Sequence, residues 1–289
     1  MSKNVLVTGA TGSIGAQLVI SLVGRDGVSV RAFVRDQRKA EPLANATAEL
    51  AIGTFDDRRS IRKATKDIDT VVLIAPAGPE AVEQNSNVLK ICKESSVSKV
   101  VRVSAIKASP DGPTENTRLH AASDEELESS GLSYVILRPN YFMQNLFMLL
   151  ESINKESSLF AAMGDARFGM MDVRDIVDCA VSATVSDHFD NQIIELSGPE
   201  CISFHDVAKV LSDVSGRTIK YIPVAPEAVM ESMLRAGLDE WISTLMRDYS
   251  QAYSEGWGDF VTDNVERMTG HAPRSIEHFV REVLAPALA

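Results

Sequence analysis

Three glycines spaced three residues apart carry the first candidate chemistry of this 289-residue chain: Gly9, Gly12 and Gly15. They follow an apolar run, 5–7, and open a segment with helical apolar periodicity, so the pattern predicts a strand, a tight turn and a helix. Unpaired N–H groups at the start of such a helix suit a pyrophosphate, and glycine lets that ligand approach the backbone. We therefore expect a dinucleotide to contact these glycines together with Thr11, Ser13 and Ile14. The alternative is a structural turn in an α/β protein that binds no nucleotide.

A cationic residue ends the next predicted strand, 28–34. An acidic side chain at this position would bind the ribose 2′-hydroxyl of NAD, whereas an arginine pairs with the additional phosphate of NADP. Arg35 therefore favours NADP(H), although Asp36 beside it leaves some ambiguity. The alternative for Arg35 is a solvated cation at the start of a helix.

Two further residues follow the predicted third strand, 48–52. Ligands of open α/β sheets bind at the carboxyl ends of the strands, so Phe55 and Asp56 are candidates to flank the adenine. Asp56 serves equally well as the N-terminal cap of the helix that follows. The sequence does not separate these two interpretations.

Charge and composition exclude several classes of function. The formal net charge of −11, without any basic run, argues against a nucleic acid or an anionic membrane as partner. The five histidines lack metal-binding spacing, and the three cysteines lack paired spacing, so we expect no metal site, no disulfide and a reducing cytoplasm. The apolar runs are too short to span a membrane. A small molecule is the expected partner, and a homodimer is left open.

Strands and helices alternate through the first half of the chain, which indicates an α/β, Rossmann-type, doubly wound parallel sheet. The predicted strands are 5–7, 28–34, 48–52, 70–75, 99–104 and 134–137. A polar loop over 106–118 is long enough to be a functional lid, and it precedes a predicted helix over 119–129. An apolar segment over 141–150 predicts another helix.

The alternation loosens beyond residue 150. Helices are predicted over 173–183, 204–214, 227–235, 240–255 and 275–283, with strands at 192–196 and 218–222. We therefore expect an NAD(P)-binding domain over 1–150 and a smaller, helix-rich α+β lobe over 151–289. No low-complexity linker separates the two.

Several blocks of sequence carry a resemblance to a known family: GATGSIG (9–15), RAFVRD (31–36), SSVSKVVRVSAIKAS (95–109), SGLSYVILRPNYFMQN (130–145), DVRDI (172–176) and ELSGPECISFHDVAKVLSDVSGR (195–217). Over nearly its whole length the chain resembles the NmrA-like family of atypical short-chain dehydrogenases/reductases. The resemblance implies a Rossmann domain, a small C-terminal lobe that closes a substrate cleft, and NADP(H) bound at the glycine turn and Arg35. It also implies that four residues border the nicotinamide half: Ala75, Ser104, Pro139 and Asn140.

Ordinary short-chain reductases use a tyrosine whose phenol is acidified by a lysine four residues later. That pair is missing here, and alignment on the SGL block gives His120 and Asp124 at the two positions. They share one face of a predicted helix, where a carboxylate can hold an imidazole as a proton donor near pH 7. We hypothesise that His120 protonates the substrate, oriented by Ser104 or Tyr141. The alternative is that His120 only caps or packs at the edge of the cleft.

Conjugated acceptors form a stabilised anion after they receive a hydride, so they need little acid catalysis. The expected function is therefore an NADPH-dependent oxidoreductase acting on a small, apolar, conjugated, carbonyl or imine compound, such as a quinone, azo compound or enone. The leading alternative is a non-catalytic, NADP(H)-sensing regulatory protein of the NmrA type. A third is redox-neutral chemistry, such as epimerisation, with a permanently bound cofactor.

Overall fold

A computed structural model describes residues 3–288, and the chain folds into two compact units. The first unit comprises the described residues up to 110 together with 117–138 and 176–194. The second comprises 111–116, 139–175 and the described residues from 195 onwards. The division differs from the single cut at residue 150 that the sequence suggests: residues 111–116 and 139–150 belong to the second unit, and 176–194 belong to the first.

A seven-stranded sheet forms the centre of the first unit, in the order β3-β2-β1-β4-β5-β6-β8. The strands are β1 Lys3–Val7, β2 Val28–Val34, β3 Glu49–Ile52, β4 Thr70–Leu73, β5 Lys99–Val103, β6 Ser133–Pro139 and β8 Gln192–Leu196. β1 pairs in parallel with β2 on one side and β4 on the other. The strand order thus reverses direction at β1, which places the topological switch point beside the glycine turn. This confirms the predicted Rossmann-type α/β fold.

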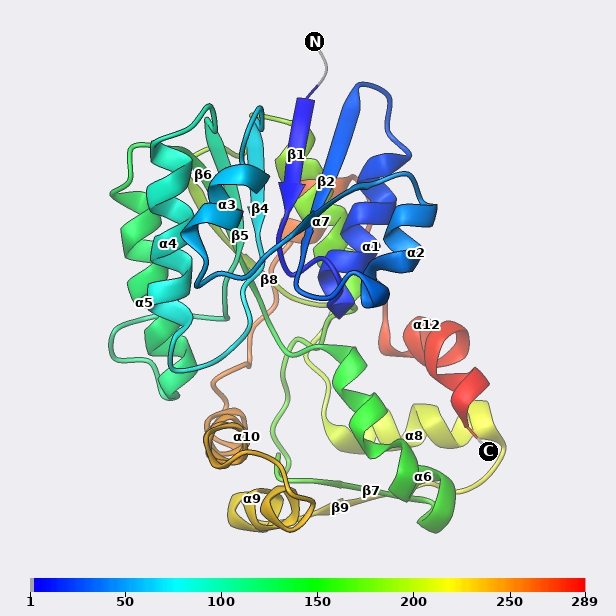
Figure 1. Ribbon diagram of the computed structural model, residues 1–289. Helices are drawn as coiled ribbons and strands as arrows, with labels where there is room; N and C mark the ends of the chain where they lie inside the picture. The colour runs from blue at the N-terminus through cyan, green and yellow to red at the C-terminus, as the bar shows by residue number, and fades with distance from the viewer. Residues whose placement is uncertain (1–2, 289) are drawn as a thin grey trace. The chain divides into compact units, whose positions relative to one another are not determined.

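Helices cover both faces of this sheet. Because side chains on both faces are buried, the strands consist of nearly continuous apolar runs. They are α1 Ser13–Val23, η1 Arg38–Ala40, α2 Glu41–Asn45, α3 Arg58–Ala64, α4 Ala81–Lys93, α5 Glu115–Glu128 and α7 Val173–Val185. α4 and α5 lie on one side and α1 lies on the other (Figure 1). α5 begins before the predicted start at 119, so the predicted loop over 106–118 ends in helix.

One face of the sheet packs its core against α3, α4 and α5. The buried cluster there includes Leu73, Val100 and Ile136 from three neighbouring strands and Leu127 from α5. Side chains alternate along a strand, so residues two positions beyond Val100 and Ile136 point to this same face. Those residues are arginines, and the candidate site is built on them.

The second unit is α+β, as predicted, around a two-stranded parallel sheet of β7 Ser158–Ala161 and β9 Lys220–Pro223. Its helices are η2 Met143–Leu149, α6 Leu150–Glu156, α8 Phe204–Ser215, α9 Pro226–Arg235, α10 Glu240–Ser254, α11 Asn264–Thr269, α12 Ile276–Phe279, η3 Val280–Leu284 and η4 Ala285–Ala287. The predicted helix over 141–150 is wrong, since a 3₁₀ segment precedes a short α-helix. β7 is a strand that the sequence analysis missed.

Neither a membrane span nor a metal cluster is found in the described part of the chain. No helix among residues 3–288 has the length and apolar character to cross a bilayer. The same residues contain no group of three or more histidine, cysteine or acidic side chains placed to hold a metal ion.

Candidate nucleotide-binding and catalytic site

The glycine turn after β1 is built so tightly that side chains cannot enter it. Gly9 has a φ of +58°, and a Cβ there would lie 2.6 Å from the carbonyl oxygen of Ile74. A Cβ on Gly15 would overlap the carbonyl oxygen of Gly9. The first and third glycines are therefore required by the turn and by the packing of α1 on it.

The N-terminus of α1 has no side-chain cap. Gly12 occupies the cap position without a side-chain hydrogen bond, and the first turn holds no acidic residue. The first helical hydrogen bond of α1 runs from the backbone N–H of Ala16 to the carbonyl of Gly12 at 3.0 Å. The N–H groups of Ser13, Ile14 and Gly15 therefore have no acceptor within the helix. By contrast, Ser203 caps α8 with a full capping box. Thr11, Gly12 and Ser13 are exposed, so the free N–H groups of α1 fit an anionic ligand.

Arg35 follows β2 and carries an exposed guanidinium that makes no hydrogen bond or ion pair with any residue in 3–288. Asp36 beside it is engaged: its carboxylate accepts from the backbone N–H of Arg38 at 2.9 Å and pairs with the Arg38 guanidinium at 3.3 Å. This pairing lowers the pKa of Asp36. The neighbouring carboxylate therefore does not neutralise Arg35, which leaves a cation available to a phosphate.

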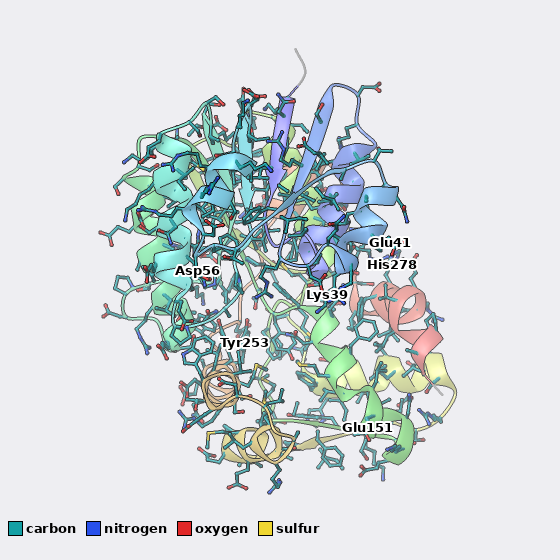
Figure 2. All side chains as sticks on the ribbon, viewed as in Figure 1. Lys39, Glu41, Asp56, Glu151, Tyr253 and His278 are labelled. Atoms are coloured by element: carbon teal, nitrogen blue, oxygen red, sulfur yellow. The ribbon has the colours of Figure 1, made fainter. Side chains whose placement is uncertain are left out.

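Phe55 and Asp56 lie in different environments. Phe55 is buried, with its ring edge-on to Phe33 at a centroid distance of 6.0 Å, so it belongs to the core. Asp56 is exposed at the carboxyl edge of the sheet, where Lys39 also lies (Figure 2), and accepts a hydrogen bond from Gln84 at 3.2 Å. The capping role suggested for Asp56 is wrong, because Asp57 caps α3.

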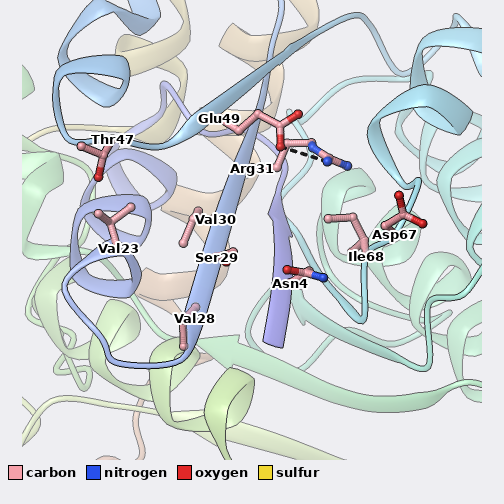
Figure 3. Close-up of a pocket in the computed structure, with 10 residues that line it drawn as sticks. All are labelled: Asn4, Val23, Val28, Ser29, Val30, Arg31, Thr47, Glu49, Asp67 and Ile68. Carbon is pink, nitrogen blue, oxygen red and sulfur yellow. Dashed lines mark ion pairs between the residues drawn. The ribbon is translucent and has the colours of Figure 1, made fainter. Parts of the chain in front are cut away.

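A pocket of about 440 Å³ lies away from the glycine turn (Figure 3). It lies near the amino ends of β1, β2, β3 and β4, and it contains the ion pair between Arg31 and Glu49 at 2.9 Å. Open α/β sheets bind ligands at the carboxyl ends of their strands. We therefore exclude this pocket from the candidate nucleotide site.

A buried ionic network lies between β5, β6 and α5. Arg102 donates to one carboxylate oxygen of Asp124. The other oxygen accepts from Arg138 at 2.9 and 3.0 Å and from the Ser104 hydroxyl at 2.8 Å. Arg102 and Asp124 are both almost fully buried. One carboxylate thus pairs with two guanidinium groups and with the Ser104 hydroxyl.

His120 joins this network through Arg102 rather than through Asp124. Its Nδ1 lies 3.2 Å from a terminal nitrogen of the Arg102 guanidinium. The predicted pairing of His120 with Asp124 is wrong, because the Asp124 oxygens are taken by the two arginines and Ser104. Burial and the charges of Arg102 and Arg138 hold the pKa of His120 well below its usual value. An imidazolium proton donor near pH 7 is therefore not what the geometry provides.

The remaining predicted residues fall in two places. Ala75 is half-buried after β4 in the first unit. Pro139, Asn140 and Tyr141 belong to the second unit, where Asn140 accepts from the Tyr253 hydroxyl at 3.1 Å. Tyr141 contacts Tyr253 with a ring centroid distance of 5.4 Å, and burial raises the pKa of its phenol. Ser104 and His120 share one network, whereas Tyr141 lies in an aromatic cluster of its own unit.

Arg102 and Arg138 are the site residues that the sequence analysis missed. Each follows apolar residues within its strand, in the runs KVVRV and SYVILRP. An arginine within a strand that is buried on both faces needs a buried anionic partner. An arginine within a strand was therefore the signal in the sequence for this site. The anionic partner, Asp124, lies on α5.

The chain is similar to known proteins over most of its length. Residues 9–148 match a family described as NAD(P)H-binding. The uncharacterized oxidoreductase YesF of Bacillus subtilis is 30% identical, across 96% of this chain and 95% of its own. The chain belongs to the NAD(P)H-binding family. This is the class of protein that the resemblance to NmrA-like reductases predicts, and the residues matched in this family include both the glycine turn and Arg35.

Two further relatives of this NAD(P)H-binding protein extend along its whole length. The NAD(P)H azoreductase of Xenophilus azovorans is 27% identical and covers 96% of both chains. The NADPH-dependent quinone oxidoreductase QOR2 of Escherichia coli, solved with NADPH, superimposes with a TM-score of 0.88 at 20% identity, covering 97% of this chain and 99% of the other. The second comparison establishes the shared fold.

Proposed function

We propose that this chain is an NADPH-dependent oxidoreductase that reduces a small, apolar, conjugated, carbonyl or imine compound. The observation that carries the proposal is an uncapped helix N-terminus at a glycine turn, combined with an unneutralised Arg35 after the next strand. The first feature suits a diphosphate and the second suits the phosphate that distinguishes NADPH from NADH. Two relatives, an azoreductase and a quinone oxidoreductase, support the substrate class.

In this proposal the backbone amides of Ser13, Ile14 and Gly15 bind the diphosphate and Arg35 binds the 2′-phosphate. Ala75 and Ser104, both in the first unit, border the nicotinamide, as the family resemblance implies. The bound cofactor supplies a hydride.

The network around His120 stabilises the negative charge that the substrate acquires. His120 donates a hydrogen bond to the atom that gains the electron pair, and the positive charges of Arg102 and Arg138 favour the anion. A conjugated acceptor spreads this charge over several atoms and then takes its proton from solvent. The arrangement therefore does not require a strong acid, which agrees with the lowered pKa of His120.

Two measurements on the purified full chain test the proposal. Calorimetry compares the binding of NADPH, NADP⁺ and NADH, and absorbance follows NADPH consumption with a panel of quinones, azo dyes, enones and imines. We expect NADPH to bind more tightly than NADH and at least one compound of the panel to be reduced. Tight binding with a silent panel would support the cofactor-sensing alternative, and the absence of NADP(H) binding would refute both.

A further inference from the structure

We infer that Arg102 is a positioning residue that fixes His120 in one neutral tautomer, with the ring proton on Nε2. The position of this proton decides which atom of the imidazole can donate a hydrogen bond. The consequence for substrate rests on the proposed function, whereas the tautomer itself is a property of the protein alone.

The argument begins with the direction of one hydrogen bond. A guanidinium carries only donors, so the Nδ1 of His120, at 3.2 Å from Arg102, must accept. A ring nitrogen that accepts carries no proton, and the neutral imidazole then holds its proton on Nε2. The opposite tautomer would direct an N–H group at another donor.

Arg102 cannot readily turn away from His120. Its side chain is 2% exposed and is held by Asp124, which is 1% exposed. The second oxygen of Asp124 is held in turn by Arg138 and Ser104. Contacts from β5, β6 and α5 therefore fix the guanidinium, and the guanidinium fixes the tautomer.

The charges that face the imidazole keep it neutral. Arg102 faces it from β5, Arg138 acts on it from β6, and Asp124 lies one helical turn away on α5. Protonation would place a third positive charge next to those of Arg102 and Arg138. Burial adds to this cost, so the neutral ring persists into the acidic range.

This arrangement gives His120 a role that differs from that of an acid. A neutral Nε2–H donates a hydrogen bond to a developing anion without transferring its proton, and its strength does not depend on pH in the neutral range. We expect the rate of reduction to show no loss through the ordinary range of histidine titration, which an imidazolium acid would produce.

Nitrogen NMR of the cofactor-free, ¹⁵N-labelled full chain tests the tautomer directly. The His120 signals are identified by their loss in His120→Gln. We expect a protonated Nε2 and an unprotonated Nδ1 that stay unchanged through the ordinary range of histidine titration. A proton on Nδ1, averaged signals from two tautomers, or titration near the ordinary histidine pKa would overturn the inference.

Two matched variants test whether Arg102 is responsible. Arg102→Met should let His120 populate both tautomers and raise its pKa. Lys99→Met removes another buried, ion-paired cation from the same strand and should leave the His120 signals unchanged. Equal changes in both variants would contradict the assignment to Arg102. If Arg102→Met does not fold, the wild-type spectrum still decides the tautomer.

The experiments distinguish a failure of the proposed reductase function from a failure of the inferred His120 tautomer. A fixed Nε2–H tautomer in a protein that reduces none of the panel would retain this inference and refute the proposed reductase. Reduction of a panel compound by a protein whose His120 samples both tautomers would do the reverse.

Discussion

Arg35 is the single side chain on which we expect the cofactor preference to depend. Its guanidinium is exposed and unpaired within residues 3–288, whereas the Asp36 carboxylate is occupied by Arg38. Arg35→Ser should weaken NADPH binding by about 1.5–3 kcal/mol, the range for a hydrogen bond to a charged group, with little effect on NADH. Calorimetry with both cofactors measures the difference.

Arg25→Ser is the matched control for this prediction. Arg25 is also exposed but precedes β2, at the opposite edge of the sheet. Arg25→Ser removes the same charge from the molecule as Arg35→Ser. A similar loss of NADPH affinity in both variants would therefore indicate a general electrostatic effect and not a phosphate contact.

Asp124 is the only carboxylate, among the described residues, that Arg102 and Arg138 are shown to share. Asp124→Asn would remove the charge that pairs with the buried Arg102 guanidinium, and we expect the free energy of unfolding to fall by about 3–5 kcal/mol. Urea unfolding measures it. Glu94→Gln breaks the exposed pair with Arg62 and should cost less than about 1 kcal/mol. Similar losses in the two variants would contradict the burial argument.

His120 should make the stability of the protein depend on pH. Its folded-state pKa lies well below the value of about 6.5 for an unfolded histidine. Below about pH 6.5, His120 therefore binds a proton in the unfolded chain but not in the folded chain. Stability should therefore be retained above about pH 6.5 and lost as the pH falls. When the pH falls from about 7.5 to 5.5, the free energy of unfolding of the wild type should decrease by about 1 kcal/mol more than that of His120→Gln. Urea unfolding at both pH values measures this difference. Parallel losses would show that His120 does not contribute.

At the scale of elements, the turn from β1 into α1 depends on the smallest side chain. Gly15→Ala would press a methyl group against the carbonyl of Gly9. We expect it to lower the free energy of unfolding by about 1–3 kcal/mol and to weaken NADPH binding, because the turn must open. Gly24→Ala, at the other end of α1, meets nothing within 4 Å at a φ of −73° and serves as control. Wild-type stability in Gly15→Ala would refute the tight packing.

At the scale of the whole molecule, a ligand that binds only the folded chain raises its stability. With NADPH at about 100 times its Kd, the expected gain is about 2.7 kcal/mol, which thermal unfolding detects as a higher Tm. The same concentration of NADH should give a smaller shift, and Arg35→Ser should reduce the difference between the two cofactors. Equal shifts by both cofactors in the wild type would contradict the preference for NADPH.

The sequence by itself determined the Rossmann-type fold and the glycine turn. Both depend on short-range patterns: apolar strands that alternate with helices, and glycines within one turn of each other. It also placed Arg35 after β2, because a strand ends where its apolar run ends. These features are local, so neighbouring residues are enough to predict them.

Only the tertiary structure decided the partner of Asp124 and the return of β8 to the first unit. The i, i+4 spacing favoured His120, but sheet pairing brings Arg102 and Arg138 onto the face that α5 covers. A buried carboxylate gains more from two guanidinium groups than from a neutral imidazole. These partners lie 22 and 14 residues from Asp124, a separation that no helical periodicity encodes.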